Sequence, residues 1–136
     1  MKKITLPAKQ EFLYEAIDFV GAFAKENGLK EGYNRVELTV EEVFSNIAAY
    51  AYLNSEGTVQ INCWMEDGSL VMEFIDSGVA YNPLEQLDPD ISLPAEIRPI
   101  GGLGIYFVKS CMDFMGYERK AEKNILTLKI QMEDKL

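Results

Sequence analysis

Histidine is absent from the 136-residue sequence. This absence excludes histidine-based catalytic triads, imidazole metal ligands and self-phosphorylation on histidine. Cysteine is scarce as well: Cys63 and Cys111 fall in segments that look like a strand and a helix, and neither spacing suggests a metal site. The simplest interpretation is a cytoplasmic protein with two buried free thiols.

Long apolar runs are also missing. No run approaches the roughly 20 residues needed to cross a bilayer, and the start, Met1-Lys2-Lys3, does not resemble a secretory signal. Basic residues are few, since 13 Lys and Arg stand against 22 Asp and Glu, for a formal net charge of −9. Binding the nucleic-acid backbone needs a basic face, so this balance argues against nucleic acid and favours a protein partner with a basic patch.

What is present fits one folded domain over residues 1–136, with 48% hydrophobic and 26% charged residues. Apolar spacings of three and four predict helices, and alternation predicts strands. In the first half of the chain, the expected elements are a strand over 3–6, helices over about 9–26 and 33–53, and a hairpin over 58–66 and 70–76 with its turn at Asp67-Gly68. An irregular segment over 84–100 and a helix from about 103 to 115, ended by Gly116, come next. The last expected element is a hairpin over 117–122 and 126–132 with its turn at Lys123-Asn124. This order predicts an α+β fold, a two-layer sandwich in which helices cover one face of a mixed, mostly antiparallel sheet.

Three closely spaced glycines, Gly101, Gly102 and Gly104, open onto the last helix. The first N–H groups of a helix lack intrahelical partners and the helix dipole favours negative charge there, so this junction can bind phosphate. The alternative is a tight turn that only introduces the helix.

Glu42 and Asn46 lie four residues apart on the predicted helix 33–53, and so on the same side of it. That side is about 60° from the apolar stripe, by the helical step of roughly 100° per residue. The pair therefore points toward the edge of the core, where a cleft would lie. The alternative is a solvated helix face.

A polar segment, Asp76-Ser77-Gly78, lies at the end of the predicted strand 70–76. A carboxylate such as Asp76 can accept the exocyclic amine of adenine, and Gly78 would let a planar base approach the backbone. Asp and Gly are also the residues that any turn uses.

The irregular segment 84–100 is long for so small a domain, and such loops are usually functional, so we interpret it as a lid. Arg98 is its one basic residue. This arginine could reach a terminal phosphate, or it could be solvated.

Three motifs occur in order: Glu42-x-x-x-Asn46, Asp76-x-Gly78-x-x-Tyr81-Asn82-Pro83 and Gly101-Gly102-Leu103-Gly104. Together they resemble the N, G1 and G2 boxes of the GHKL ATPase superfamily, which includes gyrase, Hsp90, histidine kinases and MutL. The chain is most similar to the bacterial anti-sigma-factor serine/threonine kinases, and the resemblance runs from Ile4 to Met132.

The resemblance implies a Bergerat-type site for ATP or ADP with Mg²⁺. In such a site Asn46 would bind Mg²⁺, Glu42 would act as general base, Asp76 would read adenine and Gly78 would make room for it. The remaining nucleotide contacts implied by the matching boxes and the lid are Tyr81, Asn82, Arg98, Gly101, Gly102, Leu103 and Gly104.

The resemblance also implies partners. The family holds a sigma factor and phosphorylates an anti-anti-sigma protein of the STAS type on serine or threonine, commonly as a homodimer, without direct nucleic-acid or membrane contact. Tyr50 stands where these kinases often have histidine, and it could be a changed cleft residue or a core-edge aromatic. Two alternatives stay open: a non-catalytic nucleotide-responsive binding module, and a detached histidine-kinase catalytic domain that acts on another chain.

Overall fold

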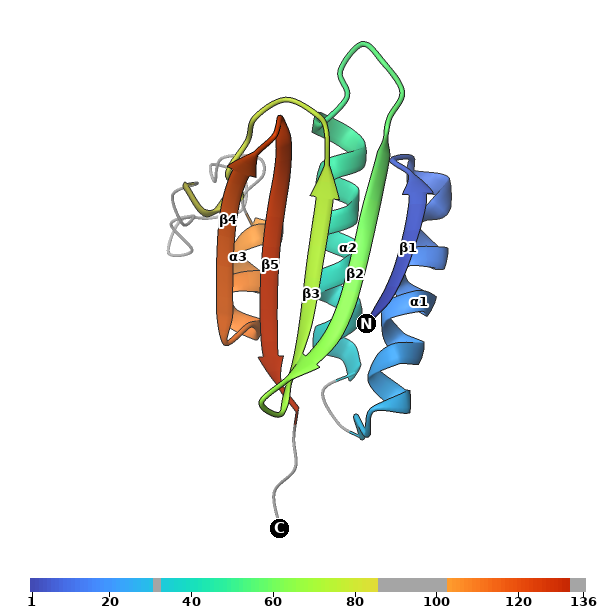
Figure 1. The fold of residues 1–136 in the computed structure, drawn as a ribbon, viewed down its shortest axis with the longest axis vertical. Coiled ribbons are helices and arrows are strands. Elements are labelled where there is room, and N and C mark those ends of the chain that lie inside the picture. The colour runs from blue at the N-terminus through green and yellow to red at the C-terminus, as the bar shows by residue number, and fades with distance from the viewer. Residues whose placement is uncertain (31–32, 86–102, 133–136) are drawn as a thin grey trace, which may run out of the picture.

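The computed structural model describes residues 1–30, 33–85 and 103–132. Its centre is a five-stranded sheet in the order β1-β2-β3-β5-β4 (Figure 1). The strands are β1 (Lys2–Pro7), β2 (Thr58–Glu66), β3 (Ser69–Asp76), β4 (Phe114–Lys120) and β5 (Lys123–Gln131). All four pairings are antiparallel, so the sheet has no parallel pair among the described strands. The α+β class is confirmed, and the expected mixture of strand directions is not seen.

Three helices cover one face of this sheet: α1 (Leu13–Glu26), α2 (Tyr33–Tyr50) and α3 (Leu103–Cys111). They lie behind the strands in Figure 1, with α1 near β1 and α3 near β4 and β5. Two short 3-10 turns, η1 (Gln10–Phe12) and η2 (Pro83–Glu85), complete the described elements. The core lies between the two layers, and within the described residues no helix combines the length and apolar character needed to span a membrane.

Alternation in β2 decides which side chains enter the core. Val59, Ile61 and Cys63 are fully buried on the helix-covered face, because successive side chains of a strand point to opposite faces. Burial raises the pKa of the Cys63 thiol to about 12, which keeps it protonated and inert. Cys111 is only half-buried, so the expectation of two buried thiols holds for Cys63 alone.

The turn between β2 and β3 is Asp67-Gly68, as the sequence predicts. Both residues have positive φ, 51° and 81°, which suits a two-residue hairpin turn. The pairing it sets places Val59 opposite Asp76, so the last residue of β3 lies at the end of the sheet near the start of β2.

Two sequence predictions are wrong at the C-terminal end. The last helix ends at Cys111, and Met115 and Gly116 lie in β4. The final turn is Ala121-Glu122, both with positive φ (53° and 62°), so Asn124 is part of strand β5. A smaller difference concerns α2, which ends at Tyr50 rather than at Leu53.

Candidate functional site

A cavity of about 140 Å³ lies between α2, the start of α3 and the ends of the central strands. Its apolar lining includes Val43, Ile47, Phe74, Ile105 and Leu126, and its polar lining is Asn46, Tyr50, Asp76, Tyr81, Tyr117 and Asn124. Three residues that the sequence selected, Asn46, Asp76 and Tyr81, therefore meet in one cavity. Asn46 comes from α2, whereas Asp76 and Tyr81 come from the end of β3 and the loop that follows it, so the packing of α2 against the sheet brings the three together.

Asp76 ends β3 and is 6% exposed, which is unusual for a carboxylate. Its Oδ1 accepts the Gly78 N–H at 2.9 Å and the Asn124 side-chain amide at 2.9 Å. No donor within the described part of the chain is bonded to Oδ2. This carboxylate therefore keeps one free acceptor oxygen at a cavity wall.

Asn124 lies directly opposite Asp76 in the β3–β5 pairing. Its Nδ2 also donates to the Val79 carbonyl at 2.8 Å, and its Oδ1 accepts from the Tyr117 hydroxyl and from the Tyr81 N–H at 3.3 Å. Sequence reasoning missed this residue because it placed the turn at Lys123-Asn124. The signal that could have found it is a polar side chain within the alternation of the last strand, where Leu126 and Leu128 also face inward.

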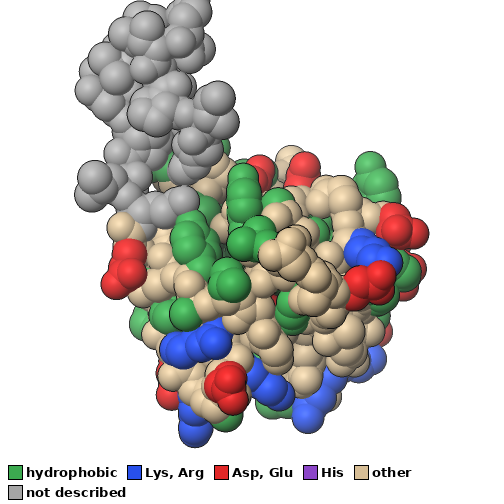
Figure 2. Space-filling model, turned by 90° about the horizontal axis from the view of Figure 1, so that it is seen from above, with side chains coloured by type: hydrophobic (Ala, Val, Ile, Leu, Met, Phe, Trp, Pro, Cys, Tyr) green, Lys and Arg blue, Asp and Glu red, His purple; other side chains and the backbone are tan. Residues whose placement is uncertain are grey.

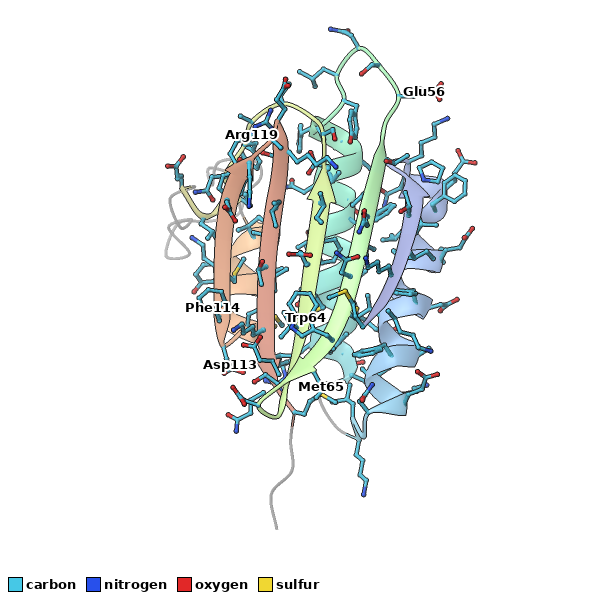
Figure 3. All side chains as sticks on the ribbon, viewed as in Figure 1. Glu56, Trp64, Met65, Asp113, Phe114 and Arg119 are labelled. Carbon is cyan, nitrogen blue, oxygen red and sulfur yellow. The ribbon has the colours of Figure 1, made fainter. Side chains whose placement is uncertain are left out.

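Arg119 is a second residue that sequence reasoning missed. Its Nη1 donates to the Gly78 carbonyl at 2.9 Å and to Asn124 Oδ1 at 3.2 Å. Figure 3 shows Arg119 at the end of β4 near which the loop that follows β3 passes. Residues 77–82, which join β3 to η2 and are called the elbow from here on, are thus bonded to both strands of the last hairpin.

Gly78 packs against the end of α2. A Cβ at this position would lie 2.3 Å from the carbonyl oxygen of Ala51, and the same carbonyl accepts the Val79 N–H at 2.9 Å. The glycine is therefore required by the close approach of elbow and helix, a reason the sequence did not reveal. Asn82 ends the elbow, and its Oδ1 accepts the Leu84 N–H at 2.9 Å.

Glu42 and Asn46 both lie half-buried on α2, as their spacing predicts. The Glu42 carboxylate packs over Gly104 in the first turn of α3, since a Cβ there would lie 2.1 Å from Glu42 Oε2. Burial, and secondarily the neighbouring Glu41 charge, raise the pKa of Glu42. Asn46 lines the cavity, and its amide makes no hydrogen bond within the described part of the chain.

The remaining sequence-selected residues are less fully placed. Arg98, Gly101 and Gly102 and almost all of the predicted lid lie outside the described residues. Leu103 begins α3. Tyr50 is 61% exposed at the cavity rim, so it is a cleft residue rather than a core-edge aromatic.

Exposed apolar side chains surround the cavity at this end of the molecule. Leu53 is 66% exposed and Val79 50% exposed, beside Tyr50 and Tyr81. Figure 2, which views this end, shows hydrophobic side chains gathered there. Among the described residues, Tyr50, Val79 and Tyr81 thus give the cavity an exposed apolar border.

The chain matches the family model described as histidine kinase-like ATPase domain over residues 6–130. It is 30% identical over 118 residues to proteins named serine-protein kinase RsbW from Bacillus thuringiensis (strain Al Hakam) and Bacillus anthracis, covering 82% of this chain and 72% of each relative.

Two solved structures share the fold. One contains RsbU and RsbW domains from Mycobacterium tuberculosis, with a TM-score of 0.65 and 12% identity, and the match covers 97% of this chain but only 33% of that one. The other is the catalytic domain of the histidine kinase ThkA, with a TM-score of 0.57 and 14% identity, covering 97% of this chain and 98% of that domain.

Proposed function

The chain belongs to the family of histidine kinase-like ATPase domains, and from this membership we propose that it binds ATP in the cavity between α2 and the elbow. The observation that carries the proposal is the buried Asp76, whose Oδ1 accepts two hydrogen bonds while its Oδ2 accepts none from the described residues. The exocyclic amine of adenine is a donor of the required kind. Val43, Ile47 and Leu126 supply apolar walls for a planar base.

The phosphates would lie toward the start of α3. Unpaired N–H groups and the helix dipole make a helix N-terminus favourable for anions. Asn46 fits a Mg²⁺ ligand because it lines the cavity and its amide makes no hydrogen bond among the residues that the structure describes. Mg²⁺ accepts oxygen ligands from side chain, phosphate and water together. When bound, Mg²⁺ would supply positive charge beside the phosphates, and Asn46 would hold it in place.

We infer that Glu42 is the general base of a phosphoryl transfer. It would take the proton of a serine or threonine hydroxyl as that oxygen attacks the γ-phosphorus and the bond to ADP breaks. The raised pKa of Glu42 makes its carboxylate a stronger base than an exposed one. Its contact with Gly104 places it beside the first turn of α3, where the phosphates would lie.

The partners follow from the relatives. Because the curated relatives are named serine-protein kinases of the RsbW type, we propose that this chain phosphorylates an anti-anti-sigma protein of the STAS type and sequesters a sigma factor. The net charge of −9 suits a basic sigma segment. We further propose that it works as a cytoplasmic homodimer, as expected from its resemblance to the anti-sigma kinases.

The test is calorimetric titration of the purified chain with ATP and ADP, with and without Mg²⁺, for wild type and Glu42→Ala. We expect micromolar, Mg²⁺-dependent binding in both proteins, and transfer of phosphate to a STAS-type partner only in wild type. Absence of nucleotide binding to wild type would overturn the proposal. Equal transfer by the variant would remove Glu42 from the reaction, and binding without any transfer would identify a non-catalytic module.

A further inference from the structure

We propose that Arg119 and Asn124 are positioning residues that hold the elbow so that one oxygen of Asp76, Oδ2, is presented to the nucleotide base. This inference rests on the proposed ATP binding and extends it to two residues with no part in the chemistry. The elbow is a loop between β3 and η2, and a loop needs outside contacts to hold a carboxylate in one orientation.

The Asn124 side chain has no capacity left for a ligand. Both of its amide hydrogens are used, on Asp76 Oδ1 and on the Val79 carbonyl, and its oxygen accepts from Tyr117, Arg119 and Tyr81. A primary amide offers two donors and one acceptor oxygen with two lone pairs. Asn124 is 6% exposed, so these bonds are protected from water, and its role is to orient the elbow.

Arg119 closes the same network from β4. One guanidinium nitrogen bridges the Gly78 carbonyl and Asn124 Oδ1, which joins the elbow backbone to the amide that holds Asp76. Hydrogen bonds from a charged donor are stronger than neutral ones. The Gly78 N–H is meanwhile bonded to Asp76 Oδ1, so Arg119 and Asp76 hold this one glycine from its two backbone groups.

As a consequence, the two carboxylate oxygens of Asp76 have different roles. Oδ1 accepts from Gly78 and Asn124 and is saturated by protein donors, whereas Oδ2 faces no protein donor within the described residues. If the elbow were loosened, the Asp76 carboxylate could rotate, and Oδ2 would no longer be held toward the nucleotide base. Because the base is common to ATP and ADP, the loss of affinity should be the same for both nucleotides.

The first test is Arg119→Met, with Lys120→Met as the matched control. Lys120 lies next to Arg119 on β4, is exposed as Arg119 is, and carries the same charge, and within the described residues no hydrogen bond joins it to the elbow. We expect Arg119→Met to weaken ATP and ADP binding by the same factor, about tenfold. Lys120→Met should leave both within about twofold. Unchanged affinity in Arg119→Met, or a loss confined to ATP, would overturn the proposal.

The second test is Asn124→Asp, which replaces the amide donor facing Asp76 with an oxygen. Among the described residues, the titratable and charged groups that face this side chain are Asp76 from β3, Tyr117 and Arg119 from β4, and Tyr81 from the elbow. In the variant two carboxyl groups would lie side by side, and like charges that close disfavour ionisation of both, so a proton shared by the pair restores the missing hydrogen bond as pH falls.

The ratio of the ATP dissociation constants of Asn124→Asp and wild type should therefore be large at about pH 8 and fall toward one by about pH 5. Asn34→Asp, which adds the same charge on the exposed first turn of α2, should give a ratio near one throughout. A ratio for Asn124→Asp that does not change with pH would contradict positioning by hydrogen bond. Failure of wild type to bind ATP would instead overturn the proposed function. Wild-type binding with Arg119→Met and Asn124→Asp both unaffected would overturn only the positioning role of Arg119 and Asn124.

Discussion

The two ends of the cavity are built differently. At the end that would hold the base, Asp76 is bonded by two donors, and its elbow is bonded to β4, to β5 and to the residue after α2. At the end that would hold the phosphates, α2 packs against α3, and within this packing the carboxylate of Glu42 lies over Gly104. Within the described residues, the base end is therefore held by backbone and buried hydrogen bonds, whereas the group that lies over Gly104 at the phosphate end is a side chain, Glu42, that can rotate.

The same comparison can be made at two glycines, Gly78 at the base end and Gly104 at the phosphate end, by asking which atom an added Cβ would meet. An added Cβ at Gly78 would meet the Ala51 carbonyl, which belongs to the backbone and cannot move alone. An added Cβ at Gly104 would meet the tip of the Glu42 side chain, which can take another rotamer. The same substitution should thus damage the fold at one end and only the chemistry at the other.

Gly78→Ala should have the largest effect. Because the new methyl group collides with backbone, either the elbow or the end of α2 must shift, and such overpacking typically costs about 1–3 kcal/mol. Urea unfolding should report this loss, together with a loss of ATP binding. Ser77→Ala is the control, since it changes an exposed neighbour without adding an atom. Full stability of Gly78→Ala would show that the base end is as adaptable as the phosphate end.

Asp76→Asn should come next, with little effect on stability and a large effect on binding. The new side chain can keep its oxygen toward Gly78 and Asn124, which places its NH2 group at the position of Oδ2. There a donor would face the amine of adenine, so we expect ATP affinity to fall about 10- to 100-fold. Asp18→Asn, on the exposed side of α1, is the control in the same titration. Affinity within about twofold of wild type would remove this role.

Gly104→Ala should separate the two ends most clearly. Alanine favours helix by about 1 kcal/mol over glycine, which offsets the displacement of Glu42, so stability should change by less than about 1 kcal/mol. Phosphate transfer should fall at least about tenfold because the base is misplaced, while ATP affinity should stay within about threefold. Single-turnover transfer and calorimetry measure the two quantities. A stability loss as large as that of Gly78→Ala would refute a flexible phosphate end.

The sequence predicts the parts of this site that depend on local spacing. The separation of Glu42 and Asn46 gives their shared helix side, and Asp67-Gly68 gives the hairpin that ends β3 at Asp76. These predictions use rules that act within a few residues. They could be made without knowing which strands are neighbours.

The parts that failed depend on distant pairing and on unusual backbone. Ala121 and Glu122 both have positive φ, a conformation that residues other than glycine rarely adopt. Because neither residue type is typical of such a turn, the sequence did not predict a turn there. Met112 and Met115 continue a helical spacing through a segment too short to separate helix from strand by periodicity. Once the turn was misplaced, Asn124 could not be recognised as the partner of Asp76 across β3 and β5.

Glu42→Gln should have the smallest effect on the fold, and its sign depends on pH. The folded state raises the pKa of Glu42 above its ordinary value of 4.5, so the wild-type glutamate loses stability as pH rises through the folded pKa. Glutamine avoids that loss. The variant should therefore be more stable than wild type at neutral pH, by less than about 0.5 kcal/mol, and equal to it below about pH 4.5. Urea unfolding across this pH range measures the difference in stability, with Glu37→Gln on the same helix as the control. If the stability advantage of Glu42→Gln shrank as pH rises, the phosphate end would be shown to stabilise the charged carboxylate instead of disfavouring it.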